Sequence, residues 1–152
     1  MPQGFQQHHR GNRSHHGHRR EQPRVPLPSI QFMKDGKLAS DLFDKQAKQA
    51  AEAVAACRRE ENKSTQLRRF YDELVMWLER VEQSPDRFAS YLPMIRMLKA
   101  KAAYARGRKL VDEKFEQLLG QIVDHATDPV RLRQSKLFFE AFLGFYKLEK
   151  GD

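Results

Sequence analysis

Hydrophobic residues recur at helical spacing along this chain from about residue 40 to its end. The most apolar stretch opens with Asp128 and Pro129, a usual first pair of a helix because the carboxylate can accept a bond from the first turn and proline lacks an N–H that would be unpaired there. Gly151 is the expected end. Apolar side chains cover most of its circumference: Leu132, Leu137, Phe138, Phe139, Ala141, Phe142, Leu143, Phe145, Tyr146 and Leu148. Such a helix must be surrounded, so we expect the other helices to pack on it.

The same periodicity predicts further helices before this one. They cover residues 40 or 41 to about 60, 65–83 with Ser64 as the cap, Pro93 to about 106, and 109–126, with a short helical turn at 86–92. Gly107 either ends the third helix or lies within a continuation. The predicted inward faces are Phe43, Ala47, Ala50, Val54 and Cys57, then Leu67, Phe70, Tyr71, Leu74, Trp77, Leu78 and Val81, then Ile95, Leu98, Ala102 and Ala105, then Val111, Phe115, Leu118, Leu119, Ile122 and Ala126.

No segment shows the sustained alternation of a strand, so the predicted class is all-α, a compact bundle of about five helices over residues 31–152. Residues 1–30 are rich in Gln, His, Arg, Gly and Pro and hold almost nothing to bury. Such a segment cannot repay the entropy of ordering, so we expect a disordered, basic His/Arg-rich tail ending in a proline-rich linker. Its histidine runs are too short to fix a metal geometry.

Charge indicates the kind of partner. The chain carries +8, and residues 1–30 account for +4 of it, five arginines against Glu21, which leaves +4 on the body. A polyanion is the natural partner, with nucleic acid ahead of a membrane surface. The single cysteine, Cys57, excludes an internal disulfide and indicates a reducing compartment. No apolar run is long enough for a membrane span and the N-terminus is polar, so we expect a cytoplasmic protein with no membrane partner.

The helix predicted from Pro93 is the most basic part of the body. Its wheel places the cations on both sides of the apolar stripe, Lys101 with Arg108 on one side near Tyr104, and Lys99 with Arg106 on the other. Six cations and no acid lie between residues 96 and 109: Arg96, Lys99, Lys101, Arg106, Arg108 and Lys109. Like charges repel along a helix, and an anionic partner such as phosphate would remove that cost. The alternative is a solvated face whose cations pair with acids from other helices.

Lys63, Arg68 and Arg69 form a second basic point at the start of the 65–83 helix. Cations there oppose the helix dipole, and the free N–H groups at Ser64 and Thr65 could hold a phosphate. Ordinary surface charges, with Arg69 facing a glutamate one turn on, are the alternative.

Signals for catalysis are poor. His125 is the only histidine in the predicted body, and no second ligand or nucleophile lies at a useful spacing from it. We therefore predict no catalytic residue, no metal site and no cofactor, and interpret His125 as a helix-end residue.

Three passages in this order, NKSTQLRRFYDEL, LKAKAAYARGR and FFEAFLGFYK, resemble the small subunit of the type III-A (Csm) CRISPR effector complex, over about residues 62–147. The small subunit of the type III-B complex is the nearest alternative. The resemblance implies a non-catalytic subunit of an antiviral ribonucleoprotein, stacked with copies of itself in a filament beside the other subunits. It would line the channel for guide RNA and target RNA.

The resemblance implies RNA contacts from the cations of the first two passages, Lys63, Arg68, Arg69, Lys101 and Arg108. The helical wheel adds Lys99 and Arg106. A competing hypothesis is a helical protein–protein adaptor whose basic face meets an acidic protein.

Overall fold

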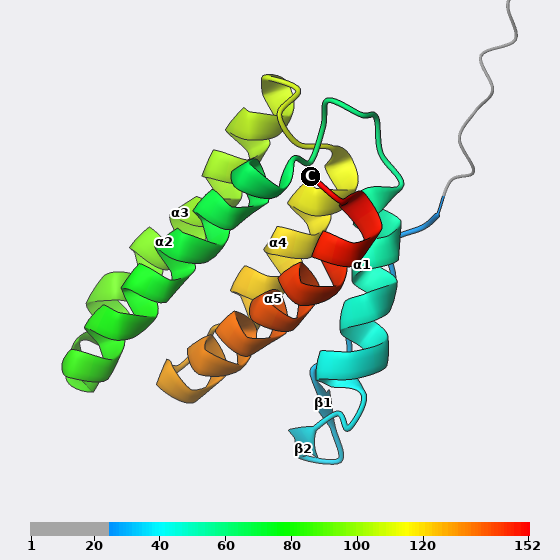
Figure 1. Cartoon of the computed structure of the whole chain (residues 1–152). Coiled ribbons are helices and arrows are strands. Elements are labelled where there is room, and N and C mark those ends of the chain that lie inside the picture. The colour runs from blue at the N-terminus through cyan, green and yellow to red at the C-terminus, as the bar shows by residue number, and fades with distance from the viewer. Residues whose placement is uncertain (1–24) are drawn as a thin grey trace, which may run out of the picture.

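A computed structural model describes residues 25–152, which fold into a bundle of five α-helices (Figure 1). The predicted all-α class is confirmed. The tail was predicted for residues 1–30, and residues 1–24 of it lie outside the described residues. The helices are α1 (Ala47–Ala55), α2 (Ser64–Gln83), α3 (Phe88–Gly107), α4 (Glu113–His125) and α5 (Pro129–Lys150), with a π-helical turn at Leu42–Gln46 and a 3-10 turn at Pro85–Arg87.

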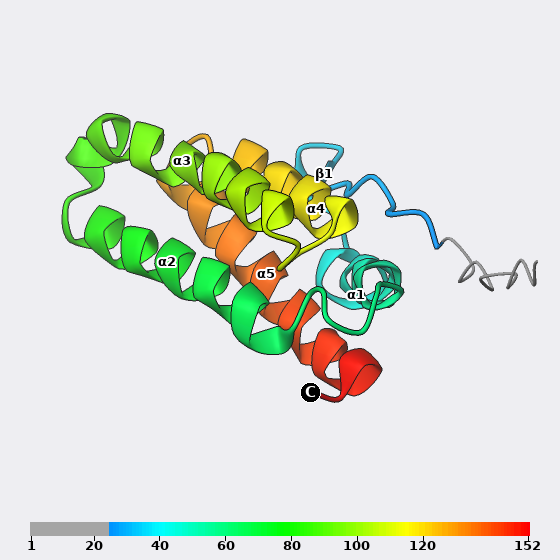
Figure 2. The same cartoon turned by 90° about the horizontal axis from the view of Figure 1, so that it is seen from above.

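The aromatic helix α5 lies in the middle of the bundle, as predicted (Figure 2). Asp128 Oδ1 accepts a hydrogen bond of 2.7 Å from the Arg131 backbone N–H, and Gly151 ends the helix with φ of +69°. Phe138, Phe139 and Phe142 are fully buried, whereas Leu148 is 84% exposed beyond the reach of the neighbouring helices. Helices α1, α2 and α4 pack on α5.

Helix α3 departs from the expectation that every helix packs on α5. It packs chiefly on α4 and α2 and so forms an outer layer (Figure 2). Its buried residues are the predicted stripe of Ile95, Leu98, Ala102 and Ala105. This stripe is narrow and half alanine, which suits close packing over two neighbouring helices and leaves much of α3 facing solvent.

The first predicted helix has a different beginning and end. The chain starts with a π-helical turn, in which the Gln46 N–H bonds to the Asp41 carbonyl at 3.0 Å. A π turn takes one more residue than an expected α turn, so Leu42 is buried in place of Phe43, which is 37% exposed. The helix ends at Ala55 rather than near residue 60, so Cys57 is a half-buried loop residue and not part of the inward face predicted for this helix.

The predicted starts of three other helices were wrong. Ser64 is the first residue of α2 rather than its side-chain cap. Helix α3 begins at Phe88 and runs through Pro93, where we predicted a break. A tilted contact between the rings of Tyr91 and Trp77, with centroids 5.7 Å apart, joins this first part to α2. Helix α4 begins at Glu113, four residues later than predicted, because Asp112 caps it by accepting a 3.0 Å bond from Phe115 N–H.

A short β-hairpin, which we did not predict, joins β1 (Met33–Lys34) to β2 (Lys37–Leu38). Asp35 and Gly36 turn the chain with φ of +52° and +75°, a conformation that Asp-Gly pairs adopt readily. Residues 25–30, which we assigned to the tail, lie against the bundle: the Ile30 N–H donates to Gln121 Oε1 of α4 at 2.6 Å.

Candidate nucleic-acid interface

The seven cations predicted to contact RNA lie on α2 and α3 or directly beside them, with Lys63 just before α2 and Arg108 just after α3. Those of α3 divide between its two sides, in agreement with the helical wheel. Lys101 forms an ion pair with Glu73 of α2, whereas Lys99 pairs with Asp124 of α4 at 2.6 Å. The two sides of α3 therefore differ in their surroundings.

On the side that faces α4, carboxylates accompany the cations. Arg106 Nη1 lies 3.0 Å from Glu116 Oε2, and Arg96 lies 4.0 Å from the Asp124 carboxylate that also pairs with Lys99. The hydrogen bond and the negative charge of Glu116 raise the pKa of Arg106. This side shows the alternative weighed from the sequence, in which acids from another helix pair with the cations.

On the opposite side, α2 and α3 enclose an open groove of about 310 Å³. We call it the α2–α3 groove, and its polar and aromatic lining consists of Gln66, Arg69, Phe70, Glu73, Lys101, Tyr104 and Arg108. Glu73 pairs with Lys101 rather than with Arg69 one turn before it. Within residues 25–152, neither Arg69 nor Arg108 forms an ion pair. The groove thus holds two guanidinium groups, one from α2 and one from the residue after α3, that have no carboxylate partner in the described part of the chain.

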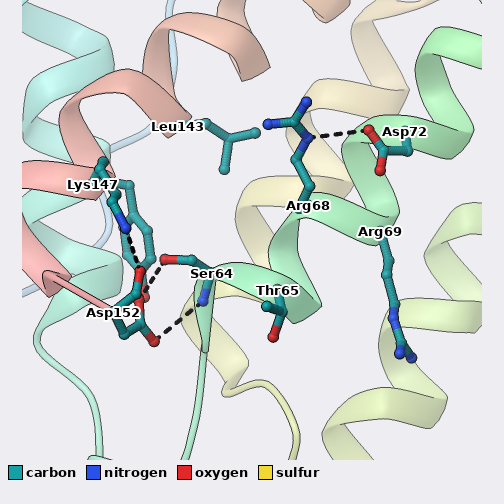
Figure 3. Close-up of a pocket in the computed structure, with 9 residues that line it drawn as sticks. Ser64, Thr65, Arg68, Arg69, Asp72, Leu143, Lys147 and Asp152 are labelled. Atoms are coloured by element: carbon teal, nitrogen blue, oxygen red, sulfur yellow. Dashed lines mark hydrogen bonds and ion pairs between the residues drawn. The ribbon is translucent and has the colours of Figure 1, made fainter.

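The second basic point borders another pocket, of about 520 Å³, between the start of α2 and the end of α5 (Figure 3). Figure 3 shows Arg68 and Arg69 leaving α2 on different sides. Arg68 Nε is 3.1 Å from Asp72 Oδ1, and its guanidinium lies 5.3 Å from the centre of the Tyr71 ring. Arg68 is therefore partly neutralised by its own helix, and Arg69 is not.

The N–H group at the start of α2 already has an acceptor within the chain. The Asp152 carboxylate accepts bonds from Ser64 N–H at 3.3 Å and from Ser64 Oγ at 2.5 Å (Figure 3). Burial opposes ionisation of Asp152, but the hydrogen bonds from Ser64 and the charge of Lys150 outweigh it, so its pKa is lowered. In this structure the Asp152 carboxylate binds the Ser64 N–H that could otherwise hold a phosphate.

The sequence did not reveal these partners. Three of them are carboxylates on another helix than the cation they pair with: Glu73, Asp124 and Glu116. The fourth, Asp152, lies at the far end of the chain from the Ser64 N–H that it binds. Only the packing of the helices brings these groups together. Tyr104, which the wheel placed near Lys101 and Arg108, lines the groove with its side chain 68% exposed.

His125 packs against the neighbouring residues at the end of α4. It is the last residue of α4, its ring stacks on Phe32 with centroids 4.0 Å apart, and Nε2 lies 2.7 Å from Gln134 Oε1. Among residues 25–152, no group of three or more His, Cys, Asp or Glu side chains is arranged to hold a metal ion. None of the helices described has the length and apolar character needed to cross a bilayer.

Similarity to a known protein family extends over the helical bundle. A family model described as Csm2 Type III-A matches residues 38–152, a longer range than the three passages of the sequence resemblance. No curated protein and no solved structure matches the chain. The family match covers all five helices and the basic residues of both sides of α3. The chain therefore belongs to the Csm2 family, the small subunit of the type III-A CRISPR effector complex, and associates with the other subunits of that complex.

Proposed function

We propose that this chain is a non-catalytic, cytoplasmic subunit that binds RNA in the type III-A complex. Copies of it stack in a filament, and their basic surfaces line the channel in which guide RNA pairs with target RNA. Its contribution to antiviral defence is to hold the RNA backbone. The proposed contacts are Lys63, Arg68, Arg69, Lys99, Lys101, Arg106 and Arg108.

One observation carries this proposal: Arg69 and Arg108 line the same groove and have no carboxylate partner in the described chain. Two guanidinium groups that share a groove repel each other, and an anion between them would turn that repulsion into attraction. Phosphate, like carboxylate, is an anion that guanidinium groups bind in two-point geometry. RNA presents phosphates at regular intervals, so a groove between two helices can follow its backbone.

The remaining cations support the proposal to different degrees. Lys63 is exposed and forms no ion pair within residues 25–152, so it is free to bind phosphate directly. Arg68, Lys99, Lys101 and Arg106 are paired with carboxylates. Exposed pairs of this kind contribute only about 0–1 kcal/mol, so phosphate can exchange with the carboxylate at small cost.

Crosslinking within the assembled complex tests this function. We would purify the type III-A complex through a tag on this chain, irradiate it with ultraviolet light, sequence the copurified RNA and locate the crosslinked peptides by mass spectrometry. CRISPR guide RNA crosslinked to peptides of α2 and α3 is the expected result. A complete complex whose RNA crosslinks lie only on other subunits would contradict the proposal and favour the adaptor.

A further inference from the structure

The α2–α3 groove contains an exposed aromatic ring that a backbone-binding surface does not need. Tyr104 is 68% exposed, the most exposed aromatic side chain among residues 25–152. It belongs to α3 but not to its buried stripe, and no aromatic neighbour stacks on it in the described chain. An exposed face of this size is available to a planar partner.

Arg108, the cation beside this ring, has no carboxylate partner in the described part of the chain. The Arg108 guanidinium lies 5.9 Å from the centre of the Tyr104 ring, and it forms no ion pair in residues 25–152. Two other arginine–aromatic contacts differ from this one. Arg68 over Tyr71 is paired with Asp72, and Trp77, under Arg80, is only 8% exposed. Only the Tyr104–Arg108 pair, among these three, combines an open ring with an unneutralised cation.

The charge of the groove suits a nucleotide. Arg69, Lys101 and Arg108 stand against Glu73, three positive charges and one negative, for a net charge of +2. Its volume of about 310 Å³ is at the lower end of the range of ligand pockets. Phosphates can lie on the arginines at the rim while a base lies on the ring, the arrangement by which proteins bind single-stranded nucleic acid.

We infer that Tyr104 is a stacking platform for an unpaired base of the bound RNA, with Arg69 and Arg108 holding the phosphates on either side. This inference rests on the proposed function, because it concerns the same RNA. It adds that the surface engages one base as well as the backbone. The base is held by its π-face, so any of the four bases fits.

The experiment compares three forms of the full-length protein, the parent, Tyr104→Ala and Tyr104→Phe, on two single-stranded RNAs of equal length. One RNA is intact, and the other carries abasic residues and so keeps its phosphates but lacks bases. Binding is measured over a salt series. Stacking of one base changes affinity by about 5- to 150-fold.

For the intact RNA, Tyr104→Ala should weaken binding within that range, and Tyr104→Phe should bind like the parent because the hydroxyl is not used. For the abasic RNA all three should bind alike. The slope of affinity against salt should not change, since no charge is removed. Because Tyr104 is exposed, its replacement should leave the circular dichroism spectrum unchanged.

The outcomes separate this inference from the function on which it rests. Equal affinity of Tyr104→Ala and the parent for intact RNA, with salt-dependent binding preserved, would overturn the stacking platform and leave the RNA-binding function in place. If the parent binds neither RNA, even within the assembled complex, the proposed function fails and the platform with it. Loss of another subunit from the Tyr104→Ala complex, with RNA affinity unchanged, would make Tyr104 a protein contact and also overturn the inference.

Discussion

Asn62 is a buried polar residue on which several parts of the fold meet. It is fully buried, its Nδ2 donates to the Val54 carbonyl at 3.1 Å, and its Oδ1 accepts from the Asp112 N–H at 2.9 Å. Its own carbonyl accepts a 2.5 Å bond from the Tyr146 hydroxyl of α5. One residue thus supplies hydrogen-bond partners to a carbonyl at the end of α1 and to an N–H at the start of α4, and it links both to α5. Its φ of +54° is one that asparagine tolerates better than most residues.

We expect Asn62→Ala to lower the free energy of unfolding by about 2–4 kcal/mol, because a buried donor and a buried acceptor lose their partners and alanine is strained at positive φ. Denaturation followed by fluorescence of the single tryptophan, Trp77, measures this. Asn62→Gly is the matched control, since it removes the same side-chain bonds without the backbone strain and should cost less. A loss below about 0.5 kcal/mol for the alanine variant would show that water replaces these bonds.

His125 gives a prediction about pH. Burial lowers its pKa below the usual 6.5, and the hydrogen bond to Gln134 only partly opposes this. The unfolded chain therefore binds a proton more readily than the folded one between the folded pKa and 6.5, so stability should fall as pH falls through this window and level off below it.

Comparison with His125→Gln, which cannot titrate, isolates this effect. We would measure the unfolding free energy of both proteins from pH 7.5 down to about pH 4.5, a range chosen around the ordinary histidine pKa. The stability of the parent relative to the variant should decline below pH 6.5. A difference that stays constant with pH would show that His125 has its ordinary pKa in the folded protein.

At the scale of elements, α5 supports the rest of the bundle. Phe139 stands between Tyr71 of α2 and Phe115 of α4, with ring centroids 5.6 Å and 6.4 Å away, and Phe142 continues the contact toward Tyr146. One row of rings, buried except for the partly buried Tyr71, therefore connects three helices. Helix α2 is far from α4 and α5 in the sequence, whereas α4 and α5 follow one another, so this row depends on the packing of α2 against the later pair.

We expect Phe142→Ala to cost about 3–5 kcal/mol, because the ring is fully buried and leaves a cavity among helices that cannot close in. Leu148→Ala on the same helix is the matched control. Leu148 is 84% exposed, so its replacement should change stability by less than about 0.5 kcal/mol. A Phe142→Ala cost under about 1 kcal/mol in chemical denaturation would refute the central role of α5.

The buried faces of the helices could be predicted from the sequence, because they follow from helical periodicity. Helix ends that depend on hydrogen bonds to residues elsewhere in the chain could not. The buried stripe of α3, Ile95, Leu98, Ala102 and Ala105, was predicted residue for residue, because 3.6-residue spacing is a local property. The end of α1 was missed, because its last carbonyls bond to Asn62 and to Lys114, which lie 8 and 61 residues away from Val54 and Ala53. No local pattern contains that information.

The same division applies to the candidate interface. The wheel separated Lys101 and Arg108 from Lys99 and Arg106, and the structure places these pairs toward α2 and α4. It could not show that Asp124 and Glu116 neutralise the second pair, because the distance of those acids from α3 is set by packing. The contribution of each cation to RNA binding stays a prediction.

At the scale of the whole molecule, the described residues carry +4, the difference between +8 for the chain and +4 for residues 1–24. This charge is unevenly neutralised. The α4 side of α3 holds Asp124, Glu113 and Glu116 beside its cations, whereas the α2–α3 groove keeps two arginines unpaired within the described part of the chain. The central claim is that RNA phosphates bind on the groove side.

A salt series with the double variant Arg69→Ala/Arg108→Ala tests this claim most directly. Both residues are exposed and outside the core, so the fold should persist, and circular dichroism checks this. The control is Lys34→Ala/Lys37→Ala, which removes the same charge from two exposed residues of the β-hairpin. The hairpin lies far from the start of α2 (Figure 1).

Each phosphate contact to single-stranded RNA contributes about 0.7 to the slope of log affinity against log salt, so the groove variant should lose about 1.4 in slope. It should also weaken binding by a similar factor for every RNA sequence, because backbone contacts carry no base information. The hairpin control should keep the slope of the parent. A folded groove variant with an unchanged slope, or a hairpin variant that loses as much, would contradict the account.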